Sequence, residues 1–323
     1  MVFDSVPTFQ PYQCRPLGQE NFKAIQQVDT TTGTPDLSGS GQGLPDRFTS
    51  HAKTVATQSS TSHNKPMLEV SIRVQRSTPA EGRPASFETH AVQVAPKASV
   101  LDALFALQCG PCPDLAFRFS CRVGMCGSCA MVVNGRECLA CTTLISTIGP
   151  ELRIQPLRNL PVTCDLAVDL KPFFQAYQLA LPHFIPRDDL DPDDFMRIPH
   201  DSPEWRSLSH QPQCIDCGSC YSACTLVTLN PRYLGPMALH RALNLIVDPR
   251  DKARTERLAA VAGETGAFRC HTLGNCRDAC PRGISPTHSI ERLKRLLVLD
   301  QIRLLFAKVF RSQKSAPLAR QNP

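Results

Sequence analysis

The chain has 323 residues, enough for about two domains at roughly 100–200 residues each. Hydrophobic residues make up 42% and charged residues 20%, which excludes a chain that is disordered throughout. No uncharged apolar run approaches the roughly 18 residues of a spanning helix, and we expect no secretory signal. The net charge of +6 equals the excess in residues 291–323, which hold eight basic and two acidic residues. Because this basic surface is local, we predict no nucleic-acid partner.

The first 66 residues are rich in Ser, Thr, Gln, Gly and Pro and show no sustained periodicity. Five basic and five acidic residues balance over this stretch, which argues against a mitochondrial transit peptide. We therefore predict a disordered extension over 1–66. Met67 stands where ordered patterning begins, so one hypothesis is that translation starts there.

Residues 67–170 carry the pattern of a small mixed β domain. Apolar and polar residues alternate over 68–74 and 87–94, which predicts two strands. Ser99 can cap a helix whose apolar stripe contains Val100, Leu101, Leu104 and Leu107. A short strand is expected at 116–119, and Asn134-Gly135 is a strong hairpin signal.

The remainder of the chain is predicted to be helical. Residues 150–186 are interpreted as a connector that includes a helix over 165–181. From about residue 210 the pattern is helical between two cysteine clusters, and the last long helix is expected over 286–309. We predict a helical domain over 171–310 and a disordered tail over 311–323.

Sixteen cysteines, about 5% of the chain, are too few for a disulfide scaffold of this length and suit metal ligation. Cys121-x4-Cys126-x2-Cys129 followed by Cys141 has the plant-type [2Fe–2S] spacing. Gly124 and Gly127 fit a loop that needs positive φ angles and amide hydrogen bonds to sulfur. The alternative is a structural zinc site, although zinc favours pairs of C-x2–4-C knuckles.

Two further cysteine runs, the first over 214–224 and the second over 270–280, resemble the bacterial two-cluster spacing. In that spacing the last cysteine of each run binds the other cluster. That rule gives a [4Fe–4S] site with four thiolates and a second site with three. Leu273 stands where the fourth thiolate is expected, so we predict [3Fe–4S] there, with [4Fe–4S] held by a non-cysteine ligand as the alternative. The ligands are Cys214, Cys217, Cys220 and Cys280 for the first site, and Cys224, Cys270 and Cys276 for the second.

The chain has no Ser/His/Asp triad, P-loop or dinucleotide fingerprint, so we predict no catalytic residues and an electron-transfer role. FSCRVGMCGSCAMVVNGRECLACTT, CIDCGSCYSAC and FRCHTLGNCRDACPRGISP resemble, in order and spacing, the three cluster motifs of the iron–sulfur subunit of succinate dehydrogenase and fumarate reductase (respiratory complex II). The resemblance covers roughly 67–300.

The resemblance implies an α+β chain with a plant-ferredoxin-like β-grasp domain followed by an all-α bacterial-ferredoxin-like domain. It implies a flavoprotein partner with FAD and a membrane anchor, often with haem b, at the cytoplasmic face of a bacterial inner membrane. Electrons would pass between FAD and quinone through [2Fe–2S], [4Fe–4S] and [3Fe–4S]. His271 resembles a family histidine near the last cluster and quinone; hydrogen-bonded packing is the equal alternative.

The chain departs from the family after Cys224. Many members have Pro next and then two Trp that help line the quinone pocket, whereas this chain has Thr225, Thr228 and Leu229. Outside the family pattern, Cys109-x2-Cys112 is interpreted as a pair of loop cysteines, with redox activity or metal binding as the alternative. The rival functions are a three-cluster subunit of another flavoprotein dehydrogenase and a zinc-binding interaction module.

Overall fold

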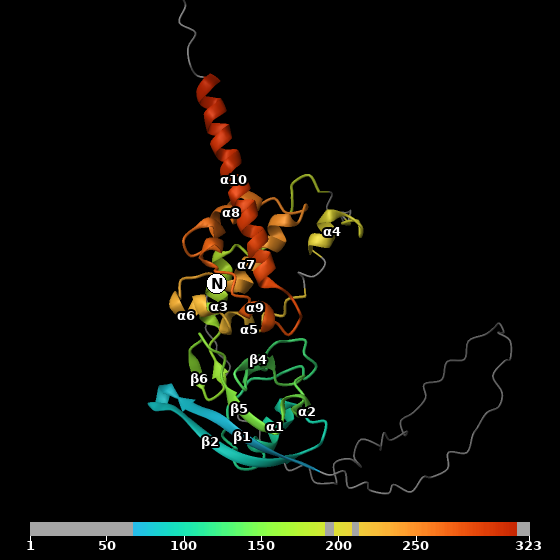
Figure 1. Ribbon diagram of the computed structural model, residues 1–323, viewed down its shortest axis with the longest axis vertical. Coiled ribbons are helices and arrows are strands. Elements are labelled where there is room, and N and C mark those ends of the chain that lie inside the picture. Colours follow the sequence, from blue (N-terminus) through green and yellow to red (C-terminus); the bar gives the residue numbers. More distant parts are fainter. Residues whose placement is uncertain (1–66, 191–196, 209–212, 315–323) are drawn as a thin grey trace, which may run out of the picture. The chain divides into compact units, whose positions relative to one another are not determined.

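The computed structural model describes residues 67–190, 197–208 and 213–314. The disordered extension predicted for 1–66 lies outside the described residues, as does most of the predicted tail. The described chain runs from a sheet-forming half into a helical half, which Figure 1 shows in blue to green and in yellow to red. The predicted order, a mixed sheet and then helices, is confirmed.

Five strands form a mixed sheet in the order β2-β1-β5-β3-β4. β1 and β2 are antiparallel, with Val70 opposite Val92, and β5 is parallel to β1. β3 and β4 form the hairpin predicted from Asn134-Gly135. The φ angles of these two residues are +49° and +81°, and a two-residue type I′ turn requires positive φ at both. The strands span Leu68–Thr78 (β1), Arg83–Val94 (β2), Ala130–Val133 (β3), Arg136–Leu139 (β4) and Glu151–Gln155 (β5).

The core of this half lies between the sheet and helix α1, Val100–Gln108. The N-terminus of α1 is fixed by a capping box, in which the Ser99 side chain accepts from the Asp102 N–H and the Asp102 carboxylate accepts from Ser99. The predicted stripe is buried in full: Val100, Leu101, Leu104 and Leu107 are all at most 2% exposed. The inward side chains of β1 form the other side of the core.

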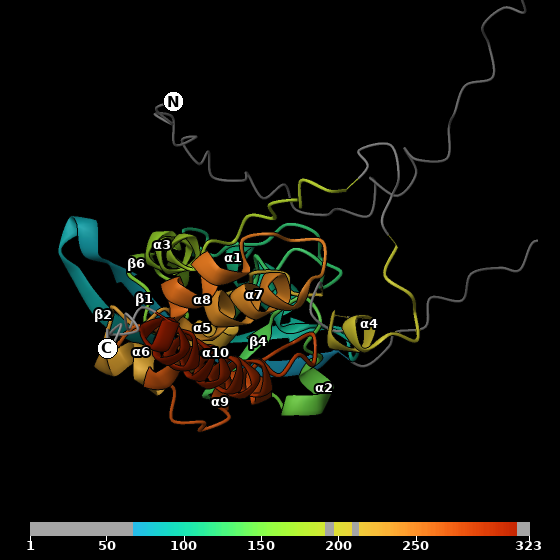
Figure 2. The ribbon, with the colours of Figure 1, turned by 90° about the horizontal axis from the view of Figure 1, so that it is seen from above.

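The helical half is organised around α7, Gly235–Val247, which is buried along almost its whole length. α3, α8 and α10 all contact it, and Figure 2 shows α7 beside α8 and α10. The helices here are α3 Lys171–Leu179, α4 Pro203–Leu208, α5 Ser219–Ser222, α6 Thr225–Leu229, α8 Arg254–Ala262, α9 Asn275–Asp278 and α10 Pro286–Lys314. Short elements elsewhere are η2 Pro79–Glu81, α2 Ile145–Ile148, β6 Val162–Cys164, β7 Ala167–Val168 and η3 Ala267–Arg269.

Four local predictions are wrong. Residues 116–119 form no strand, because the Ala116 backbone bonds to Asp165 and Leu166 rather than to the sheet. Residues 151–155 are β5 rather than connector, and the helix expected over 165–181 begins only at Lys171. α10 begins at Pro286 as predicted but continues to Lys314, four residues into the predicted tail.

Candidate metal centres

The first cysteine loop folds around its own sulfur atoms. Three backbone N–H groups donate to the Cys121 Sγ at 3.3–3.5 Å, and the Cys121 N–H donates to the Cys126 Sγ at 3.5 Å. Gly124 and Gly127 both have a φ of +72°, as predicted for a loop that turns its amides toward sulfur. The three donors to Cys121 come from Val123, Met125 and Cys126.

These hydrogen bonds change the acidity of the thiols. Burial opposes ionisation of Cys126, but bonds from the backbone of Cys121 and from Ser128 outweigh it and lower the pKa of Cys126 to about 6. Burial raises the pKa of Cys129 to about 12, and the neighbouring Cys141 and Cys126 thiols contribute. Cys121 and Cys126 are thus joined by hydrogen bonds, and the Cys129 thiol lies near those of Cys126 and Cys141.

Four cysteines line one cavity in the helical half, and they are those predicted for the [4Fe–4S] site: Cys214, Cys217, Cys220 and Cys280. Burial raises the pKa of Cys214 to about 12 and that of Cys220 well above its ordinary value, and the charges of neighbouring thiols add to both. Buried thiols grouped in this way ionise when a cation binds them. The donor set therefore fits an iron–sulfur cluster.

The second cavity is lined by the other three cysteines, Cys224, Cys270 and Cys276. His271 and Leu273 also line it, and Leu273 is 60% exposed at the position where a fourth thiolate was expected. The structure thus brings Cys280 to the cavity of the first run and Cys224 to that of the second. This exchange is the one that the two-cluster spacing predicts.

Two residues at the second cavity were missed from the sequence. The Tyr233 hydroxyl is buried at the cavity, where burial and the neighbouring Cys270 thiol raise its pKa. Cluster sulfides and thiolates accept hydrogen bonds, so a buried hydroxyl donor fits a cluster here. The Lys294 Nζ donates to the Cys270 carbonyl at 2.6 Å, which brings a positive charge near the thiolates. Isolated Tyr and Lys residues give no pattern that would identify either role.

The first cysteine loop, at Gly127, directly contacts the first cysteine run, at Cys217. A Cβ built on Gly127 would lie 2.7 Å from the Cys217 Cβ and 2.9 Å from the Cys217 Cα, closer than real Cβ atoms approach. Only glycine leaves room for this contact. The predicted [2Fe–2S] loop and the predicted [4Fe–4S] cavity are therefore neighbours in space.

Hydrogen bonds from Asn159 also stabilise this junction between the sheet half and the helical half. The Asn159 Nδ2 donates to the carbonyls of Tyr221, Ser222 and Cys224 at 3.0–3.1 Å. The Thr228 hydroxyl in turn donates to the Asn159 Oδ1 at 2.7 Å. Thr228, at a position where many family members have Trp, thus helps to hold Asn159 against the end of α5.

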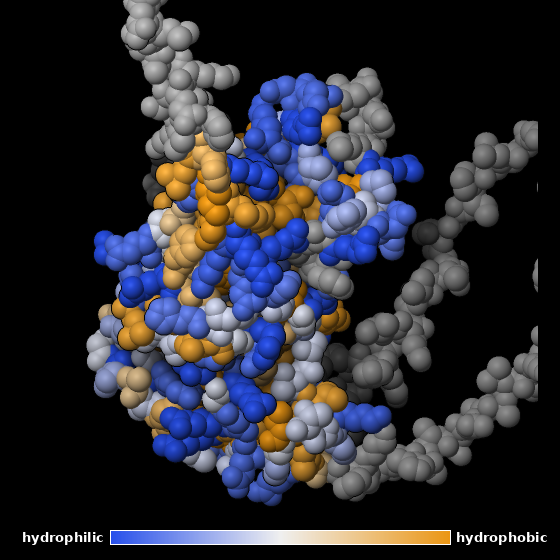
Figure 3. All heavy atoms as spheres, turned by 45° about the horizontal axis from the view of Figure 1, so that its top comes forward, coloured by the Kyte–Doolittle hydropathy of each residue, from blue (hydrophilic) through white to orange (hydrophobic). Residues whose placement is uncertain are grey.

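An apolar patch lies on the exposed part of α10. Figure 3 shows hydrophobic side chains gathered along this helix. None of the helices over the described ranges is both long and apolar enough to span a bilayer. Five large side chains of the patch are 42–62% exposed and share one face of the helix: Val298, Leu299, Ile302, Leu305 and Phe306.

Comparisons with known proteins agree with this geometry. Residues 71–175 match the family described as a 2Fe-2S iron-sulfur cluster binding domain, and residues 211–284 match a 4Fe-4S dicluster domain. These two matches define an iron–sulfur electron-transfer protein. Residues 71–175 include the first cysteine loop, and residues 211–284 include all seven cysteines that line the two cavities.

Relatives identify the particular family. The chain is 32% identical over 243 residues to the fumarate reductase iron-sulfur subunit of Haemophilus influenzae, covering 72% of this chain and 93% of that protein. It is 37% identical over 207 residues to the succinate dehydrogenase iron-sulfur subunit of Paracoccus denitrificans, covering 62% and 76%. The structure matches a chain of the Mycobacterium smegmatis Sdh1 complex with a TM-score of 0.67 and 28% identity, covering 73% and 98%. The chain belongs to the family of succinate dehydrogenase and fumarate reductase iron–sulfur subunits.

Proposed function

We propose that this chain is the electron-transfer subunit of a succinate:quinone oxidoreductase, and that it carries electrons from the FAD of a flavoprotein subunit to membrane quinone. Substrate chemistry then takes place on the flavoprotein. The observation that carries the proposal is the contact of Gly127 with Cys217, because it makes two cluster sites neighbours along one route.

The route passes through three clusters of different type. Amide donors around Cys121 support a [2Fe–2S] cluster, and the cavity with four thiols supports [4Fe–4S]. The cavity with three thiols and Leu273 supports [3Fe–4S]. The proposed ligands are Cys121, Cys126, Cys129 and Cys141; Cys214, Cys217, Cys220 and Cys280; and Cys224, Cys270 and Cys276.

The two ends of the route face different partners. Val123 and Met125 are 64% and 69% exposed on the first cysteine loop, which suits docking of the flavoprotein. At the other end, His271 and Leu273 are exposed beside the third cluster site, where we propose that quinone binds. The α10 patch would contact the membrane anchor, with or without haem b, at the cytoplasmic face of a bacterial inner membrane.

The test is purification of the tagged chain from detergent-solubilised native membranes, followed by an assay of succinate-driven quinone reduction. We expect a flavoprotein and membrane subunits to copurify and the assay to be positive. Recovery of a different flavoprotein, with clusters intact and no succinate activity, would assign the chain to another dehydrogenase. Recovery of quinol-driven fumarate reduction alone would reverse the proposed direction.

A further inference from the structure

Two polar side chains occupy the inward face of β2. Glu88 and His90 are two residues apart on the strand, so they share a face, and this face continues inward to the buried Val92 and Val94. Neither is fully exposed: the side chain of His90 is 24% exposed and that of Glu88 is 44% exposed. Polar groups on an inward face need hydrogen-bond partners.

The residue opposite them is Cys112, which none of the three proposed cluster sites uses. It is only 2% exposed and follows the end of α1, in a turn where its N–H donates to the Leu107 carbonyl at 2.9 Å. Its carbonyl accepts from the Leu115 N–H at 3.1 Å. The Sγ is therefore held in place by backbone hydrogen bonds on both sides.

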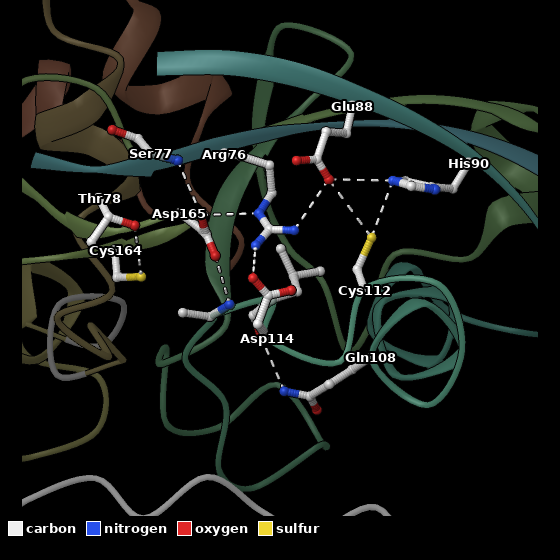
Figure 4. A network of polar contacts seen from close by, with 12 residues as sticks. Arg76, Ser77, Thr78, Glu88, His90, Gln108, Cys112, Asp114, Cys164 and Asp165 are labelled. Atoms are coloured by element: carbon white, nitrogen blue, oxygen red, sulfur yellow. Dashed lines mark hydrogen bonds and ion pairs between the residues drawn. The ribbon is translucent and has the colours of Figure 1, made fainter. Parts of the chain in front are cut away.

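The three side chains meet at one point, as Figure 4 shows. The Cys112 Sγ lies 3.1 Å from the His90 Nε2 and 3.9 Å from the Glu88 Oε2, and these last two atoms are 3.4 Å apart. Zinc bonds of about 2.0–2.3 Å in a tetrahedron separate such ligand atoms by roughly 3.3–3.6 Å. The observed triangle is close to one face of that tetrahedron.

The charge around this triangle favours a cation. The Arg76 guanidinium contacts Asp165, Asp114 and Glu88 at 3.1, 2.6 and 3.2 Å. Arg83 also acts on Asp114, so two positive charges face three carboxylates and leave a net charge of −1 before Cys112 ionises; Arg76 lies beside the Cys112 thiol as well and favours its ionised form. The Arg76 Nη1 donates to the Glu88 Oε2, the same oxygen that faces His90 and Cys112, and so holds the proposed ligand atom in place.

We propose that Cys112, His90 and Glu88 bind a structural zinc ion that joins the turn after α1 to β2. The fourth position is open to water on the exposed side of Glu88 and His90. The sequence suggested metal binding only as an alternative for Cys109-x2-Cys112, because two cysteines form an incomplete site; β2 supplies the missing ligands. This site is independent of the electron-transfer function proposed above.

The test measures zinc and iron by mass spectrometry in the complete chain, purified with its partners after a chelator wash. Zinc K-edge X-ray absorption then gives the zinc ligands without interference from iron. We expect about one zinc ion per chain, with one sulfur and three nitrogen or oxygen ligands. Cys112→Ser and His90→Gln should each lower the zinc content at least about tenfold, while the iron content remains that of the wild type.

Two matched variants control for the loss of any cysteine. Cys109→Ser removes the other cysteine of the same turn, and Cys164→Ser removes a half-buried cysteine elsewhere in the sheet half; both should keep zinc. Absence of zinc from the wild type, with none taken up on adding zinc chloride, would overturn the proposal. So would zinc that persists in Cys112→Ser or His90→Gln, or zinc with four sulfur ligands, since that ion occupies an iron site.

Discussion

The two halves of the molecule hold their cysteines in different ways. In the sheet half, three predicted ligands lie within nine consecutive residues, and backbone N–H groups donate to the sulfur atoms of two of them. In the helical half, each cavity combines cysteines from two runs that lie more than 45 residues apart, as Cys280 and Cys224 illustrate. The first site is a local structure, whereas the other two are properties of the tertiary fold.

This difference predicts how the loss of one cysteine ligand should affect the other cluster sites. Loss of a ligand in the local loop should remain local. Loss of a ligand in the helical half should affect both cavities, because the runs are shared and α9 carries Cys276 next to the Cys280 turn.

The largest effect is expected from Cys280→Ser. It removes a thiolate from the first cavity and disturbs α9, which supplies Cys276 to the second, so both clusters of the helical half should be lost. Electron paramagnetic resonance of the purified chain should retain the [2Fe–2S] signal alone, and succinate-driven quinone reduction should fall at least about 100-fold. Cys138→Ser, a change at a cysteine outside the proposed sites, should keep all three signals.

Gly127→Ala tests the contact between the two halves. Alanine at a φ of +72° costs about 1–2 kcal/mol, and the collision with Cys217 adds roughly 1–3 kcal/mol of overpacking. Gly135→Ala is the matched control, since its φ is +81° but no atom lies within 4 Å of the added Cβ. Thermal unfolding should therefore show the larger loss for Gly127→Ala; equal losses would contradict the close contact.

Leu273→Cys tests why the second cavity should hold three irons. The new thiolate would stand at the position expected for the fourth ligand, so the proposed three-iron cluster should become [4Fe–4S]. The measurement is the iron content, which should rise by about one per chain, with loss of the EPR signal of the oxidised three-iron cluster. Leu229→Cys, at another exposed leucine of this half, should change neither quantity.

Asn159→Gly should weaken the junction more gently. Glycine keeps the φ of +62° but removes three hydrogen bonds to carbonyls near Cys224, so we expect about 1–3 kcal/mol lower stability in denaturant unfolding. Thr228→Val removes one bond to Asn159 and should cost roughly 0.5–1.5 kcal/mol. If Thr228→Val were the more harmful change, Asn159 would not be the centre of the junction.

The smallest effect is expected from Tyr233→Phe. If the buried hydroxyl donates to the third cluster, it stabilises the reduced, more negative form. Its removal should lower the midpoint potential of that cluster by about 20–60 mV, the equivalent of about 0.5–1.5 kcal/mol for one electron. A redox titration followed by EPR measures the shift, and the potentials of the other two clusters should not move.

The parts predicted from sequence were those with local causes. The helix cap at Ser99, the alternation of β1 and β2, and the Asn134-Gly135 turn each depend on neighbouring residues, and all three are confirmed. β5 was missed because ELRIQ is short and lies between Pro150 and Pro156, so it resembled part of a connector. Its position in the sheet comes from pairing with β1, about 80 residues earlier in the chain.

For the site, too, only the features with local causes could be predicted from the sequence. Cysteine spacing predicts the ligand sets, and these stay predictions, because spacing reflects local loop geometry and a known exchange between two runs. The contact of Gly127 with Cys217, the bonds of Asn159 and the meeting of Cys112 with His90 join segments distant in sequence. A single amino-acid sequence contains no pattern that would predict such contacts between distant segments.

The central claim is that the local loop and the two shared cavities hold three clusters of different type. The most direct measurement is a redox titration of the purified wild-type complex followed by EPR and iron analysis. The account predicts a three-iron signal in the oxidised protein, and two-iron and four-iron signals on reduction, in equal amounts. Two four-iron signals with no three-iron signal, or a colourless protein that contains zinc alone, would contradict it.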